Sequence, residues 1–363
     1  MKLYRYVWTP FAVAVAVGLL WKTQEVTAGV RAGLLICASV IIPSLFPFMI
    51  LAGLIASTQV GAVLSRLVSV FTRRTIGLPE NLGAVLLMSF VGGFPVGARM
   101  LSSMLERHEI DRETANRALC FCVNAGPSFL ISALGASMLG SKTAGLLVLA
   151  AQILSSLMIG AFLFYGKPLQ TSAAQTVPQP RDTFVGAVQS ASAGILSICA
   201  FVVAFSAITA LLNALGILSS LAYLLSRLFP FLGEPFFLAA LTGLLEVTRG
   251  CIAASALHTR AGFILCAFLV SFSSMSIIFQ VKSCFSADSG VNFGMFYNSR
   301  LAHGTLTALF AALAYRLIPP AELAVTAVLS TPIPKATPNM LVTCACLICM
   351  CSMLLLPAPR RKC

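Results

Sequence analysis

The stretch NLGAVLLMSFVGGFPVGARMLSSM, residues 81–104, is apolar enough to enter a lipid bilayer, but Gly and Pro interrupt its centre. A second stretch, FFLAALTGLLEVTRGCIAASAL at residues 236–257, is interrupted between Glu246 and Gly250. Irregular backbone at membrane depth is tolerated only where protein or a water-filled cavity supplies hydrogen-bond partners. Two such segments in matching positions of two halves are typical of a transporter's binding site.

Composition assigns the whole chain to a membrane. The chain is 58% hydrophobic and 10% charged, with a mean hydropathy of +0.95. Soluble domains carry about 25% charged residues. The net charge of +13 is spread over loops and termini, with no block dense enough to bind nucleic acid. The sequence therefore predicts an all-α polytopic protein whose partner is the lipid bilayer and not a nucleic acid.

Cysteine, histidine and acidic residues give no sign of a metal site or a catalytic site. Most of the twelve cysteines lie in apolar stretches, as Cys37 does, where Cys acts as a small hydrophobe. Cys346 and Cys349 share a helical face but have no His or acid nearby. We expect no disulfides, metal, cofactor, ATP-binding loop or enzyme activity. The three histidines are expected in loops or at the membrane interface: His108, His258 and His303.

The order of apolar segments suggests two repeated halves. The first half is predicted to contain a span kinked by prolines (31–57), an interfacial amphipathic helix (60–71), a re-entrant hairpin (81–104), a broken span (118–138) and an uninterrupted span (143–165). The second half repeats this order, with its hairpin at 236–257, its broken span at 261–281 and a plain span near 299–317.

Local sequence supports the repeat. AGILSICAFVVAFS from Ala193 echoes AGLLICASVIIPS from Ala32, and LSRL at Leu225 repeats LSRL at Leu64. Three full crossings separate the matching spans if the hairpin returns to its own side, so the second repeat is predicted to be inverted, as in alternating-access transporters. The predicted domains are an N-terminal transmembrane helix (1–29), a first repeat (30–165), a polar linker (166–183), a second repeat (184–318), and a loop with a C-terminal transmembrane helix (319–363).

Five motifs resemble one known family. They are IIPSLFPFMI (41–50), SFVGGFPVGARM (89–100), NAGPSFLISALG (124–135), GLLEVTRG (243–250) and SFSSMSIIFQV (271–281). In this order they resemble the YlbJ/SpoVV family of sporulation integral membrane proteins, whose nucleoside-recognition Gate repeats are similar to the core of concentrative nucleoside transporters. The resemblance covers roughly residues 30–318, most of the chain.

The resemblance implies a function in sporulation. It implies a multi-pass protein of the outer forespore membrane that moves dipicolinic acid out of the mother cell. Two alternatives stay open, namely transport of a nucleoside or another organic anion, and a non-transporting role in assembly of the forespore membrane. The basic end of the chain, Arg360 to Lys362, favours a cytoplasmic C-terminus. The sequence leaves the oligomeric state open.

Charged residues near the interruptions are the first candidates for the site. Glu246 is an acid inside an apolar stretch, where charges normally face a cavity. It is interpreted as a site for a coupling cation (Na⁺ or H⁺), as a structural pair with Arg249, or as a substrate contact. Arg99 and Arg249 follow the two interruptions and match the two carboxylates of dipicolinate. The alternative for Arg99 is an interfacial position near the hairpin base.

Polar residues in the broken spans complete the candidate site. Helix ends exposed by such breaks attract carboxylates through free amide groups, although hydroxyls in membrane helices often serve only in packing. The candidate substrate contacts are Asn124, Ser128, Ser273, Ser274, Ser276 and Gln280. The residues expected to shape the breaks, without binding a ligand, are Gly92, Gly93, Pro95, Gly126 and Pro127.

Overall fold

Helices make up the fold in the residues that the computed structural model describes, which are 16–56, 59–75, 78, 80–164, 184–286 and 288–318. No strand occurs in these ranges. The linker predicted at 166–183, the C-terminal segment 319–363 and most of the first predicted span lie outside them. Within them, four helices are long and apolar enough to cross a bilayer: Thr23–Leu51, Lys142–Phe164, Phe184–Ala214 and Arg260–Ser283.

The first described span is a helix in three parts: α2 (Thr23–Ile36), a π-helical turn (Cys37–Ile41) and α3 (Ile42–Ala56). It begins before residue 31, so the boundary predicted at 29/30 falls inside α2. The π-helical turn ends two residues before Pro43, which cannot donate a backbone hydrogen bond. The hydroxyl of Ser44 donates instead to the carbonyl of Val40 at 2.6 Å.

This span packs antiparallel against α9 (Phe184–Ala214). Gly29, near the start of α2, touches Ala210, whereas Gly53, near the end of α3, lies beside Ala187. Between these contacts, Cys37 Sγ lies 3.8 Å from the Cys199 carbonyl oxygen. Small residues bring the backbones close, which favours helix association in lipid.

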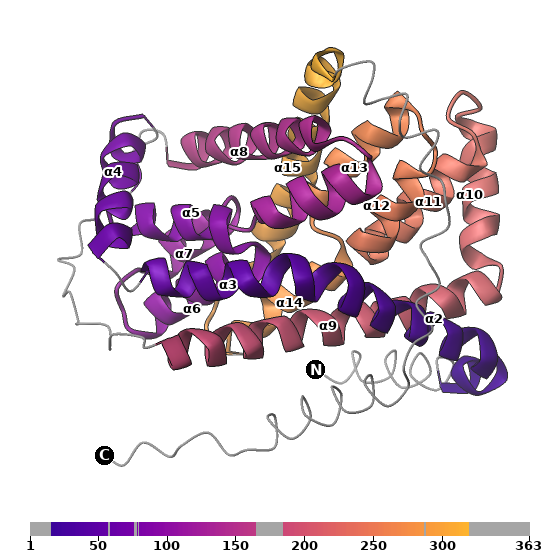
Figure 1. Ribbon diagram of the computed structural model, residues 1–363, viewed down its shortest axis with the longest axis horizontal. Coiled ribbons are helices and arrows are strands. Elements are labelled where there is room, and N and C mark those ends of the chain that lie inside the picture. Colours follow the sequence, from indigo (N-terminus) through magenta and orange to yellow (C-terminus); the bar gives the residue numbers. More distant parts are fainter. Residues whose placement is uncertain are drawn as a thin grey trace.

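Two shorter helices lie at opposite ends of the molecule (Figure 1): α4 (Gln59–Thr75) and α10 (Ile217–Leu228). Each presents large apolar side chains outward, such as Leu67 and Phe71 on α4 and Leu224 on α10. These are the two segments that carry LSRL. An apolar outer face suits contact with lipid, as the amphipathic pattern predicts.

Both interrupted stretches form tight helical hairpins. The first consists of α5 (Glu80–Gly92) and α6 (Phe94–Glu106), and the second of α11 (Glu234–Leu245) and α12 (Val247–Ser255). Each interruption is one residue long, Gly93 or Glu246. The interruptions predicted from Gly and Pro in the first stretch, and between Glu246 and Gly250 in the second, are therefore too long. Pro95 is accommodated in the first turn of α6, where the backbone amide that proline lacks would have no helical partner.

Glycine allows the second arm of the first hairpin to pack closely. A Cβ on Gly97 would overlap the carbonyl oxygen of Cys122 and approach Ser89 Cβ to 2.9 Å. Gly97→Ala is therefore expected to destabilise the protein by about 1–3 kcal/mol, the usual cost of overpacking. The measurement is thermal unfolding of the detergent-purified protein. Gly53→Ala is the control, because its Cβ would lie 3.5 Å from Ala187 Cβ, and equal stability of the two variants would contradict the prediction.

Both stretches predicted to be broken spans contain a break in their helices. In the first, α7 (Arg112–Leu119) is separated by a non-helical segment from the π-helix η2 (Ser128–Met138). Asp111 caps α7, and hydrogen bonds from Thr114 lower the pKa of the Asp111 carboxyl. In the second, α13 (Arg260–Phe272) and α14 (Met275–Ser283) meet at two serines.

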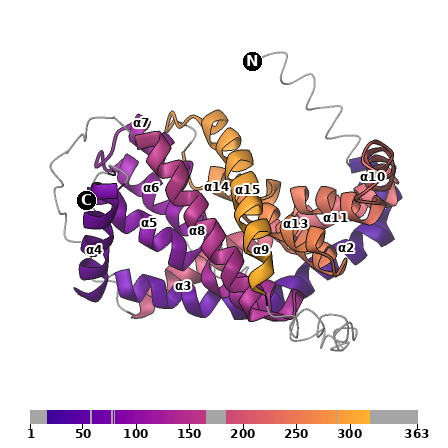
Figure 2. The ribbon, with the colours of Figure 1, turned by 90° about the horizontal axis from the view of Figure 1, so that it is seen from above.

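The two long helices α8 (Lys142–Phe164) and α15 (Phe293–Ala314) pack against each other beside the broken spans (Figure 2). α8 also contacts η2, and α15 packs along α13. A short 3₁₀ turn, Tyr315–Leu317, ends the described chain at this helix. These two helices thus pack along the segments that contain the two breaks.

Candidate functional site

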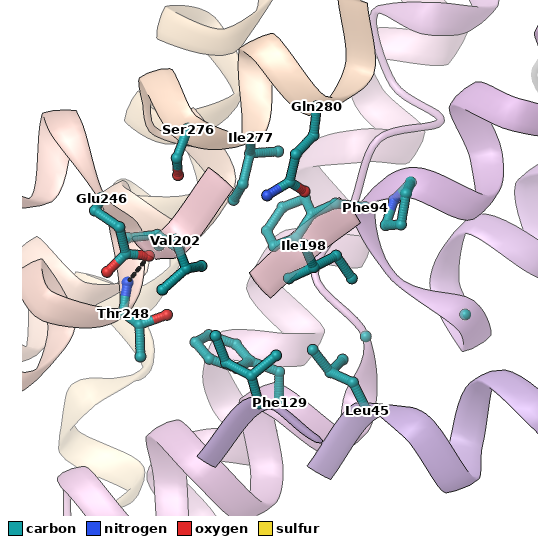
Figure 3. A pocket seen from close by; sticks show the side chains of 15 residues that line it. Leu45, Phe94, Phe129, Ile198, Val202, Glu246, Thr248, Ser276, Ile277 and Gln280 are labelled. Carbon is teal, nitrogen blue, oxygen red and sulfur yellow. Dashed lines mark hydrogen bonds between the residues drawn. The ribbon is translucent and has the colours of Figure 1, made fainter. Parts of the chain in front are cut away.

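A pocket lies where both hairpin tips and both breaks meet (Figure 3). It encloses about 490 Å³ of empty space, including its open part. The first half contributes the turn before α3, the tip of the first hairpin and the break before η2, while the second contributes α9, the tip of the second hairpin and α14. The lining residues are Ile41, Leu45, Gly92, Phe94, Pro95, Gly126, Phe129, Ile198, Val202, Glu246, Val247, Thr248, Ser276, Ile277 and Gln280.

Two glycines bring the first hairpin tip against the first break. Gly93 has φ +82°, a left-handed conformation that favours glycine. A Cβ on Gly93 would lie 3.4 Å from the amide nitrogen of Gly126. Gly92 and Gly126 themselves line the pocket. The tip and the break therefore form one continuous wall of backbone and small residues.

Glu246 forms the second hairpin tip. Its backbone is extended, with φ −141° and ψ 119°, and its side chain is completely buried. The carboxylate accepts hydrogen bonds from the amides of Thr248 at 3.0 Å and Arg249 at 2.8 Å. It thereby caps α12 with a negative charge at the positive end of the helix dipole.

α14, which follows the second break, supplies two polar residues of the pocket wall. Ser273 adopts a left-handed conformation with φ +64°, which ends α13. α14 then begins without a side-chain cap. Ser276 and Gln280, one turn apart on α14, line the pocket, and the hydroxyls of Ser274 and Ser276 lie 2.9 Å apart.

The first break is held by side chains of α8 and α15. The side-chain amide of Gln152 pairs with the backbone of Ala125 through both of its ends. Its oxygen accepts from the Ala125 amide at 3.1 Å, and its nitrogen donates to the Ala125 carbonyl oxygen at 3.0 Å. Arg300 donates to the carbonyl oxygens of Val123, at 2.9 Å, and Cys120. These bonds supply the partners that unwound backbone needs at membrane depth.

Arg300 and His303 were missed by the sequence reasoning. His303 is completely buried, with Nδ1 3.3 Å from the Arg300 guanidinium and Nε2 3.3 Å from the Gln152 carbonyl oxygen. Its expected place in a loop or at the interface is therefore wrong, because it lies in the interior of α15. The rule that singled out Glu246, a charge within a span, applies equally to Arg300.

The predicted site residues fall into three groups. Six line the pocket: Gly92, Pro95, Gly126, Glu246, Ser276 and Gln280. Gly93, Pro127 and the buried Asn124, Ser128, Ser273 and Ser274 lie at the tip or the breaks without lining the pocket. Neither Arg99 nor Arg249 lines it. Asn124 donates to Ser89 Oγ at 3.1 Å and to the Phe121 carbonyl at 2.8 Å.

The two arginines point toward α9. Arg249 Nη1 donates to the carbonyl oxygen of Ser206 at 3.3 Å. Arg99 Nη1 would lie 3.1 Å from a Cβ placed on Gly194. The ion pair between Glu246 and Arg249 that the sequence offered as one interpretation is absent from the salt bridges of the described chain, since Glu246 binds the backbone amide of Arg249 and not its guanidinium.

The described chain contains no cluster of three or more His, Cys, Asp or Glu side chains that could hold a metal ion. The titratable and polar groups at the pocket are Glu246, Thr248, Ser276 and Gln280, and the rest of its wall is apolar or glycine. Such a wall suits a solute with an apolar ring and a few polar groups.

Four apolar helices long enough to cross a bilayer, with no strand in the described residues, define an all-α polytopic membrane protein, as the sequence predicts. No family model and no solved structure matches the chain. The chain is 24% identical over 313 residues to the sporulation integral membrane protein YlbJ of Bacillus subtilis (strain 168), a match that covers 79% of this chain and 76% of the relative. The resemblance to the YlbJ family of sporulation integral membrane proteins, which the five motifs indicate, is thus confirmed.

Proposed function

We propose that this sporulation membrane protein carries dipicolinate from the mother cell across the outer forespore membrane by alternating access. The observation that carries the proposal is the central pocket, where both hairpin tips and both breaks meet. Broken helices around one site between two halves are the arrangement that secondary transporters use. A protein that served only in membrane assembly would have no need of such a pocket.

The pocket's chemistry fits an aromatic dicarboxylate. Four helical segments, α6, η2, α12 and α14, begin at the pocket or within two residues of a lining residue, and Glu246 already caps one of them, α12. Helix N-termini favour carboxylates through unpaired amides and the helix dipole. The apolar walls, among them Phe94 and Phe129, offer surfaces against which a planar ring can pack.

Inverted repeats would let the two halves open the pocket to either side in turn. The antiparallel packing of the first span on α9 supports this relation, because equivalent helices of inverted repeats run in opposite directions. Cys37 and Cys199, each in an Ile-Cys-Ala run of the echoed segments, meet at this contact. The amphipathic helices α4 and α10 at opposite ends of the molecule support the same relation (Figure 1).

Glu246 is proposed to bind the coupling cation. An ionised carboxylate in the pocket would repel a dicarboxylate substrate, since like charges at close range in a low dielectric are costly. A proton or Na⁺ on Glu246 removes that repulsion and links substrate binding to the cation. The cytoplasmic C-terminus remains a prediction, because that segment lies outside the described residues.

A neutral solute is the second candidate. No Arg or Lys is among the residues that line the pocket, and a carboxylate-binding site often uses one. Ser276 and Gln280 can hydrogen-bond the sugar or base of a nucleoside as well as they bind an anion.

Uptake into proteoliposomes separates these candidates. We expect radiolabelled dipicolinate to accumulate, and Gln280→Leu to lower its uptake at least tenfold. Gln24→Leu, at an exposed position on α2, is the control and is expected to transport normally. Uptake of uridine without dipicolinate would favour the nucleoside alternative. No uptake of either by a folded protein would favour an assembly role.

A further inference from the structure

A second cavity lies away from the central pocket. It encloses about 510 Å³ of empty space, including its open part. Its polar lining groups are the side chains of Ser141, Ser255, His258, Thr259 and Tyr315, and no acidic residue lines it. His258 and Thr259 are exposed, whereas Ser141 and Ser255 are buried, so the cavity reaches from the surface into the protein.

Two helices join this cavity to the central pocket. α12 begins at the pocket with Val247 and Thr248 and ends at Ser255, which lines the second cavity. η2 begins beside the pocket residue Phe129 and is followed by Leu139, which also lines the second cavity. Nine residues of helix cover roughly 14 Å at 1.5 Å per residue. The two cavities thus lie at opposite ends of one pair of packed helices.

The charges around the second cavity favour an anion. α8 and α13 both begin at its wall, where Ser141 Oγ accepts from the Ala144 amide at 2.9 Å and Thr259 Oγ1 accepts from the Gly262 amide at 3.1 Å. The first residues of these helices are the cations Lys142 and Arg260. The Arg260 guanidinium lies 5.7 Å from the centre of the Tyr315 ring. Helix N-termini and basic side chains both raise the local concentration of anions.

We propose that this second cavity is a vestibule that binds a small organic carboxylate on its path to or from the central pocket, between α12 and η2. The inference rests on the proposed function and deepens it, because it assigns one end of the path to named residues. In the structure the two cavities are separated by the packed helices. α12 and η2 must therefore move apart for a solute to pass between the two cavities. The vestibule itself stays open to the surface beside His258 and Thr259.

The test labels a cysteine placed in the cavity. Ser255→Cys, in the full-length protein in liposomes, is treated with a small methanethiosulfonate reagent carrying either a sulfonate or a trimethylammonium group. Peptide mass spectrometry follows position 255 separately from the native cysteines. Ser155→Cys is the matched control, because Ser155 is a completely buried helical serine that lines neither cavity.

The expected result is a sulfonate reaction at least tenfold faster at position 255 than at position 155. When the rate of each reagent at position 255 is divided by its rate with a free thiol, the sulfonate reagent is expected to give the higher ratio. Millimolar dipicolinate is expected to slow the sulfonate reaction at position 255. A rate at position 255 as low as the control, or a preference for the cationic reagent, would overturn the vestibule. Ala144→Cys, on α8 in the lining of the same cavity, repeats the measurement if Ser255→Cys does not fold.

Failure of the proposed function gives a different pattern. A protein that takes up no dipicolinate but still reacts preferentially with the sulfonate reagent at position 255 retains an anion vestibule for another solute. A protein that takes up dipicolinate, while dipicolinate leaves the labelling rate unchanged, transports it by a path that avoids this cavity. That second result overturns the inference and leaves the proposed function in place.

Discussion

Arg300→Met is expected to destabilise the protein by about 2–6 kcal/mol, because the carbonyl oxygens of Cys120 and Val123 lose their donor, at about 1–3 kcal/mol for each unsatisfied buried group. Arg300 is completely buried in α15, and its guanidinium also lies 5.0 Å from the centre of the Phe296 ring. The side chain spans the unwound segment between Cys120 and Val123. Loss of this fork should loosen the wall of the central pocket.

Heating the detergent-purified variants and following the folded fraction by size-exclusion chromatography gives the measurement. The unfolding temperature of Arg300→Lys should lie between those of Arg300→Met and the wild type, because an ammonium keeps the charge but loses the planar fork of the guanidinium. Arg316→Met, at an exposed position just beyond the same helix, is the control and should unfold near the wild-type temperature. If Arg300→Met and Arg316→Met unfold at the same temperature, the proposal that Arg300 supports the first break is wrong.

Glu246→Gln is expected to lower cation-coupled dipicolinate uptake at least tenfold while the protein stays folded. The amide keeps one oxygen that can accept from the cap amides of Thr248 or Arg249, but it cannot bind a proton or Na⁺ as a carboxylate does. Glu246→Ala loses the cap as well, which costs about 0.5–2 kcal/mol. Comparing the two variants separates the charge from the cap.

Proteoliposome uptake with an imposed proton or Na⁺ gradient measures the effect of losing the charge. Thermal unfolding of the same variants measures the effect of losing the helix cap. Glu234→Gln is the matched control, because Glu234 is the exposed first residue of α11 in the same hairpin. It should leave uptake and stability unchanged. Wild-type uptake by Glu246→Gln, with the same gradient dependence, would rule out the coupling role and leave only the cap.

Much of the architecture could be predicted because its signals are local. Gly93 and Glu246 stand out within apolar stretches, and both prove to be hairpin tips. The length of each break could not be predicted. Pro95 is disruptive in the middle of a helix but harmless in its first turn, and a sequence does not say which of these positions a proline occupies.

The candidate site was predicted only in part. Glu246, Ser276 and Gln280 line the pocket, but Arg99 and Arg249 do not. All of these residues lie near a break, so position along the chain does not separate the two groups. What separates them is the direction of each side chain, because those of Arg99 and Arg249 reach α9 and not the pocket.

By itself, the sequence determined the membrane class and the order of hairpins and breaks, because composition, hydrophobic length and helix-breaking residues act over short distances. Its motifs also carried the resemblance to the YlbJ family. Only the tertiary structure decided what satisfies the first break. Arg300 lies 177 residues after Val123 in the chain, and Gln152 lies 27 residues after Ala125. The polar groups freed by an unwound segment must find partners wherever another helix passes, and that depends on packing between distant segments.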